Sequence, residues 1–147
     1  MLRETIVIFR GKEFLLYDFG KQRSWQVGDL QSTDNISIPE DASVVMVEPE
    51  KHRTNEMQAI LTGGCSSSVE PVNRVLAFNF DKISQAGDDI YSCATFDLAP
   101  MPSARFMHQS AIVLADTGFQ LMVFGGKESR RNWTNSVISL DLKPYFK

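Results

Sequence analysis

The sequence predicts an all-β protein, and three observations support that prediction. Short runs of β-branched and aromatic residues recur along the 147 residues, with Gly, Asn, Asp and Pro between them. No segment has the 3.6-residue spacing of apolar side chains that marks an amphipathic helix. The same elements also return at a regular interval, which is typical of repeat proteins. We therefore expect residues 1–147 to be built from strands.

The expected strands follow one another as short apolar runs. The first two flank the tight turn Arg10-Gly11 and are expected to form a hairpin. The polar segments 48–56 and 81–89 are expected to be solvated turns. The predicted strands are residues 5–9, 13–19, 43–48, 57–62, 74–80, 110–115, 119–124 and 136–142.

The interval of the repeat is 62 residues. Gly63-Gly64 returns as Gly125-Gly126, and the strand 73–80 returns as 135–142. A proline precedes each glycine pair, Pro39 the first pair and Pro102 the second. Residues 12–19 fit onto 73–80, so the approximate repeats are 1–37, 38–100 and 101–147.

The last repeat has the clearest order of elements. It contains Met101-Pro102, then Arg105 and His108 three residues apart, then an apolar strand closed by Gly125-Gly126, then residues 135–141. This order resembles the kelch repeat, the blade of a β-propeller. The repeat 38–100 keeps Gly63-Gly64 but lacks the Arg and the His.

The resemblance implies about two and a half four-stranded antiparallel blades, which is an incomplete propeller, since closed propellers have about 4 to 8 blades. Further blades of the same parent protein, or another chain, are then expected to complete it. The resemblance also implies that six residues are structural parts of the blades, through close backbone approach and satisfied carbonyls: Gly63, Gly64, Gly125, Gly126, Arg105 and His108.

Composition excludes several classes of protein. The net charge of -3 and the pI of about 5.3 argue against a nucleic-acid surface. No apolar run approaches the roughly 18 residues of a membrane span. Two cysteines, Cys65 and Cys93, are too few for a disulfide framework and favour a reducing compartment, so we expect a cytoplasmic protein without membrane contact.

Catalytic and cofactor chemistry has little support in the sequence. His52, His108, Cys65 and Cys93 are scattered rather than set at metal-ligand spacing. Cys65 has no evident base, and neither glycine pair belongs to a phosphate-binding loop. We expect no metal, no cofactor and no enzymatic activity.

The loop 127–134 is the candidate site. Arg130, Arg131 and Trp133 lie within four positions of each other, and Arg and Trp are favoured anchors of protein interfaces. The alternative is that Trp133 folds back on its own blade. We expect a non-catalytic scaffold that presents its loops to a protein partner. Two other functions stay open: a carbohydrate or small-molecule enzyme on the same propeller, and a ubiquitin-ligase substrate adaptor, which would need a BTB or F-box domain.

Overall fold

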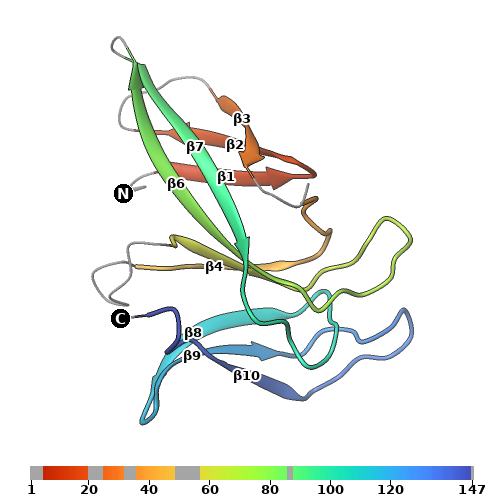
Figure 1. Ribbon diagram of the computed structural model, residues 1–147. Helices are drawn as coiled ribbons and strands as arrows, with labels where there is room; N and C mark the ends of the chain where they lie inside the picture. Colours follow the sequence, from red (N-terminus) through yellow and green to blue (C-terminus); the bar gives the residue numbers. More distant parts are fainter. Residues whose placement is uncertain (1–4, 20–24, 32–35, 49–56, 86–87, 147) are drawn as a thin grey trace. The chain divides into compact units, whose positions relative to one another are not determined.

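The structure, a computed structural model, describes residues 5–19, 25–31, 36–48, 57–85 and 88–146 (Figure 1). These ranges contain strands and no helix. The described part of the chain therefore has no helix long and apolar enough to cross a membrane. The prediction of an all-β fold is confirmed. The strands are β1 (Thr5–Arg10), β2 (Glu13–Asp18), β3 (Gln26–Gln31), β4 (Ser43–Met46), β5 (Ala59–Thr62), β6 (Val75–Gln85), β7 (Asp88–Asp97), β8 (Gln109–Ala115), β9 (Gly118–Phe124) and β10 (Val137–Asp141).

Two strands were not predicted, and one predicted turn is wrong. The expected turn 81–89 is mostly strand, because β6 continues to Gln85 and β7 begins at Asp88. β3 was missed because it contains Gly28, a residue that weakens strand propensity. Its partner explains the glycine, since a Cβ at Gly28 would lie 2.5 Å from Cζ of Phe14 on β2. The other expected turn, 48–56, lies outside the described residues except at Glu48.

The strands pair into two sheets. The larger has the order β1-β2-β3-β7-β6-β5-β4, and the smaller has the order β10-β9-β8. β3 and β7 pair in parallel, through Leu30 with Cys93 and Gln31 with Ala94. The strands of the predicted repeat 38–100 lie next to one another in this sheet, in the order β7-β6-β5-β4. The larger sheet differs from separate four-stranded blades in the parallel pairing of β3 with β7.

The chain divides into two compact units, residues 1–38 with 78–96 and residues 39–77 with 97–147. The core of the first unit is aromatic. Phe9 stacks on Phe78 with ring centroids 4.3 Å apart, and Phe14 meets Phe80 edge to face at 5.4 Å. Phe14 and Leu16 of β2 are fully buried, which fixes the face that this strand turns inward.

The second unit holds two hairpins of similar design. β4 pairs with β5 and β8 pairs with β9, and both pairs are antiparallel. Alternation sets their buried faces, as in β9, where Leu121 and Val123 are fully buried. β4 packs against β8, and the hydroxyls of Ser43 and Ser110 form a hydrogen bond of 2.7 Å between them.

The 62-residue interval is present in the backbone hydrogen bonds of the second unit. Three N–H to carbonyl bonds after Gly63 recur, at the same spacing, after Gly125. Each of these bonds closes the same part of the loop that follows a glycine pair. The bonds are Gly63 to Arg74 and Gly125 to Ser136, Val72 to Gly64 and Thr134 to Gly126, and Ser66 to Glu70 and Glu128 to Asn132. The sequence repeat is therefore also a repeat of backbone structure.

The second glycine of each pair is held in a crowded position. Gly125 and Gly126 both have left-handed backbone conformations, with φ of 70° and 85°. A Cβ at Gly126 would lie 2.7 Å from the carbonyl oxygen of Phe106 and from Cβ of His108. A Cβ at Gly125 would meet nothing closer than the carbonyl oxygen of Thr134 at 4.0 Å. Within the later pair, only Gly126 is therefore required by space as well as by φ, whereas in the earlier pair a Cβ would clash at both glycines.

This difference gives a matched pair of variants. Gly125→Ala should lose about 1–2 kcal/mol of unfolding free energy, the cost of a left-handed L-residue. Gly126→Ala should lose at least about 1 kcal/mol more, because the Phe106 backbone must move as well. Urea unfolding of both variants measures the difference. Equal losses would mean that the close approach at Gly126 does not constrain the fold.

Candidate functional site

Two loops follow the two glycine pairs, and we call residues 65–72 and 127–134 the paired loops. Each begins with an isolated antiparallel bridge to the segment before its hairpin, Cys65 to Glu40 and Lys127 to Phe106. Each then closes on itself by a second bridge, to Pro71 and to Trp133 respectively. Both loops extend to the same side of the second unit (Figure 1). The repeat therefore places equivalent loops side by side.

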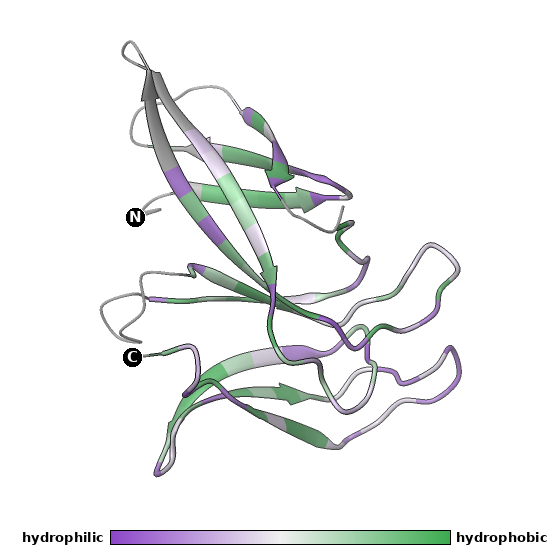
Figure 2. Cartoon of the chain, viewed as in Figure 1, coloured by the Kyte–Doolittle hydropathy of each residue, from purple (hydrophilic) through white to green (hydrophobic). Residues whose placement is uncertain are grey.

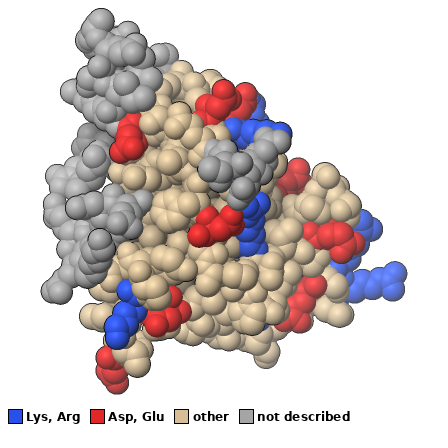
Figure 3. Space-filling model, viewed as in Figure 1, with Lys and Arg blue, Asp and Glu red and all other residues tan. Residues whose placement is uncertain are grey.

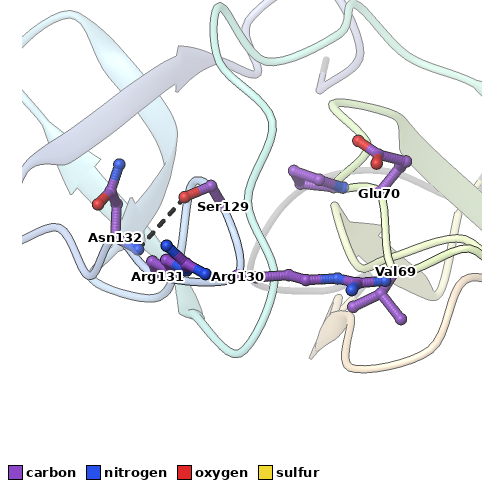
Figure 4. A pocket seen from close by; sticks show the side chains of 7 residues that line it. Val69, Glu70, Ser129, Arg130, Arg131 and Asn132 are labelled. Atoms are coloured by element: carbon purple, nitrogen blue, oxygen red, sulfur yellow. Dashed lines mark hydrogen bonds between the residues drawn. The ribbon is translucent and has the colours of Figure 1, made fainter.

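A pocket of about 390 Å³ lies between the paired loops. Arg130 spans it, since its Nη2 donates a hydrogen bond of 3.1 Å to the carbonyl oxygen of Ser68 on the other loop. Figure 4 shows the Arg130 side chain reaching toward Val69. The pocket is open to solvent, and its lining residues are Val69, Glu70, Pro71, Ser129, Arg130, Arg131 and Asn132.

The structure brings together two of the three predicted contact residues. Arg130 and Arg131 both line the pocket and are both exposed. Trp133 lies on the same loop but outside the lining. The residue is 66% exposed, and the Lys127 ammonium lies 4.6 Å from the ring centroid. The expected alternative, a Trp packed onto its own blade, does not describe this ring, which contacts its own loop and remains largely open to solvent.

The lining residues of the loop 65–72 were missed by sequence reasoning. Among Val69, Glu70 and Pro71 only one residue is charged and none is aromatic, so their residue types did not mark them as interface anchors. The signal that could have found them is the repeat itself, because they stand 62 positions before Arg131, Asn132 and Trp133. Val69 also has a left-handed φ of 61°, which is strained for a β-branched residue.

Charges of both signs surround the candidate site. The pocket combines two guanidinium groups with the Glu70 carboxylate. On the face of the molecule in Figure 3, the described Lys and Arg atoms are interspersed with Asp and Glu atoms. Among the described residues, this face therefore carries no extended area of one sign (Figure 3).

Arg105 supports the base of the loop 127–134 from within. It is only 2% exposed, and its Nη1 donates to the carbonyl oxygens of Ser136 at 2.7 Å and Gly125 at 3.3 Å. Its Nη2 donates to the Ser136 hydroxyl and lies 3.7 Å from the Glu128 carboxylate. Arg105 thus holds the two strand ends between which the loop begins and ends.

His108 lies beside the glycine pair of the earlier repeat. The side chain is 3% exposed, and its Nε2 forms a hydrogen bond of 2.7 Å with the Thr62 hydroxyl. Nδ1 has no hydrogen-bond partner in the described part of the chain. Burial lowers the pKa of His108 below its ordinary value of 6.5, and the charge of Arg105 lowers it further, while the Thr62 hydrogen bond opposes both.

The two cysteines are poorly suited to nucleophilic chemistry. Burial raises the pKa of Cys65, and the carboxylates of Asp41 and Glu40 raise it further. Burial raises the pKa of Cys93 to about 12. Both thiols are free and buried, so the reactive thiolate is disfavoured at neutral pH. In the described residues, no three His, Cys, Asp or Glu side chains gather as a metal site would require.

Comparisons of the chain with protein-family models, with curated proteins and with solved structures found no match. The function is therefore inferred from the chain itself.

Arg105 should be the most sensitive charged residue of the second unit. Arg105→Met keeps the length of the side chain but removes its charged donors from the carbonyl oxygens of Gly125 and Ser136, so we expect a loss of about 2–4 kcal/mol in unfolding free energy. Arg131→Met, the same change at an exposed position, should stay within about 0.5 kcal/mol of the parent chain. Urea unfolding checks both values, and similar losses would contradict a structural role for Arg105.

His108 should make stability depend on pH. Because its pKa is lower in the folded chain, the unfolded chain binds more protons below pH 6.5, and stability should fall as the pH drops through that value. The loss is at most about 1.4 kcal/mol per pH unit. The urea midpoint of the parent chain at pH 7.5 and 5.5 should differ more than that of His108→Gln. An unchanged pH dependence in His108→Gln would exclude His108 as the cause.

Proposed function

We propose that this chain is a non-catalytic protein-interaction scaffold, part of a larger kelch-type β-propeller that presents the paired loops to a protein partner. The observation that carries the proposal is the open pocket between equivalent loops, lined by Arg130 and Arg131 and flanked by the exposed Trp133. Arg and Trp are over-represented among the residues that dominate binding energies in protein interfaces.

The propeller part of the proposal rests on the repeat. The hydrogen bonds of the loop after Gly63 recur after Gly125, as stacked blades of one design require. Arg105 and His108 are buried and bonded to the backbone and side chains around the glycine pairs, in agreement with their proposed role in blade structure. The blades that complete the ring would come from the same parent protein or from another chain.

A scaffold accounts for the pocket better than an enzyme does. General acid–base catalysis needs at least one titratable group positioned near its partner, and glycoside hydrolysis needs two carboxylates. The lining has a single carboxylate, Glu70, and no His, Cys or Lys. The pocket offers the exposed guanidinium donors of Arg130 and Arg131, which suit binding. We include a cytoplasmic location in the proposal, because it would keep Cys65 and Cys93 reduced.

Loss of the three side chains should weaken partner capture without weakening the fold. The loop variant combines Arg130→Ala, Arg131→Ala and Trp133→Ala. The control variant removes two cationic side chains and one exposed aromatic side chain elsewhere, by the substitutions Arg10→Ala, Lys143→Ala and Phe19→Ala. Immobilised parent, variant and control chains are compared by quantitative recovery of cellular proteins and by thermal unfolding. We expect at least one protein whose recovery falls about tenfold or more with the loop variant alone, as loss of interface anchors implies.

Two outcomes would overturn this proposal. Recovery that is the same for the loop variant and the control would show that the paired loops are not the binding site. A large fall in unfolding temperature of the loop variant alone would show that these side chains stabilise the blade.

A further inference from the structure

One face of the β8-β9-β10 sheet is exposed and combines apolar side chains with Gln120, Ser139 and Asp141, and we call it the open face. It carries Phe124 and Met122 of β9, Val113 of β8 and Val137 of β10, which the strand register places on the same side. Phe124 is 43% exposed, Val113 40% and Val137 56%. Figure 2 shows hydrophobic residues along β9 and β10. The opposite face of the sheet contains Leu121, Val123 and Ile138 and is buried.

The earlier repeat has an equivalent face, and that face is covered. Thr62 and Val75 occupy the positions of Phe124 and Val137, 62 residues earlier, and they are 0% and 1% exposed. Ile60, at the position of Met122, is also fully buried. The equivalent face is therefore buried in the earlier repeat and exposed in the later one.

The cover of the earlier face is the later repeat itself. β8 packs against β4, Ser110 bonds to Ser43, and His108 bonds to Thr62. The backbone takes part as well, since the Gly64 N–H donates a hydrogen bond of 2.8 Å to the carbonyl oxygen of Arg105.

The contacts that seat the later repeat have counterparts on the open face. Gln109 stands where Ser43 does, opposite Phe124 in the register as Ser43 is opposite Thr62. Gly126 stands where Gly64 does, and its N–H has no acceptor among the described residues. One position differs, because Phe124 replaces Thr62 and offers no hydroxyl to a histidine.

We infer that the open face is the seat of a further repeat of the same kind, docked as the later repeat is docked on the earlier one. The occupant is a β-sheet with an apolar face like that of Leu121, Val123 and Ile138, supplied by additional polypeptide. It would carry a polar side chain at the position of Ser110, to meet Gln109. At the position of His108 it would carry an apolar side chain, to meet Phe124. This inference rests on the proposed propeller but not on the paired loops.

A tandem extension tests the inference directly. Lys143 stands one interval after Asp81, so the chain is continued after Leu142 with a second copy of residues 81–147, in which His108 is replaced by Leu. Val137→Cys is introduced in the first copy as a probe, because Cys65 and Cys93 are buried. Val27→Cys on β3, outside the open face and 57% exposed against 56% for Val137, is the matched control.

Maleimide labelling is followed in the original and extended chains. The cysteine at position 137 should react about tenfold or more slowly in the extended chain, as expected for a position that becomes buried like Val75. The cysteine at position 27 should react at the same rate in both. Ile112→Lys in the added copy, which spoils its docking side, should restore fast labelling at position 137.

Two results would overturn the inference. The first is equally fast labelling at position 137 in the extended and original chains, which would mean that the face does not seat such a sheet. Protection that instead rises with concentration in the original chain would make a second copy of this chain the occupant. Because position 137 is outside the paired loops, failure here and failure of partner capture are separate findings.

Discussion

The second unit depends on Arg105 more than on any other described side chain. Its guanidinium binds the carbonyl oxygens of Gly125 and Ser136, at the bases of the loop that carries the candidate site. Its backbone binds the earlier repeat, accepting from the Gly64 N–H and donating to the Val72 carbonyl oxygen. One residue therefore holds both paired loops at their bases. The bonds from its two terminal nitrogens offset part of the desolvation of its charge, while its buried Nε has no hydrogen-bond partner among the described residues.

The sequence was sufficient for those features that depend on local residue types. The strands of 43–46, 59–62, 109–115, 118–124 and 137–141 lie where apolar runs predicted them, and the glycine pairs revealed the repeat. β3 could not be predicted because Gly28 is explained only by the Phe14 ring against it, 14 positions away. β7 was missed because its burial, at Cys93 and Thr95, is supplied by pairing with distant strands rather than by its own pattern.

The candidate site shows the same division. Arg130, Arg131 and Trp133 could be selected from composition alone, because they are residue types with high interface propensity. Their geometry could not be, since it is set by the hydrogen bond from Arg130 to Ser68 and by the turn at Val69 on another loop. Composition identifies which side chains can bind, whereas the repeat decides which segments stand opposite them.

The pair formed by Thr62 and His108 has a consequence for how such a chain assembles. Repeats of one design can dock on the wrong neighbour, a characteristic failure of repeat proteins. A sheet that carries His108 would meet Phe124 if it docked one position out of order, and its imidazole would be buried without the Thr62 hydroxyl. In the docking that we propose, that unsatisfied group would oppose misassembly, and the exchange of Thr for Phe at one repeated position would distinguish the two seats.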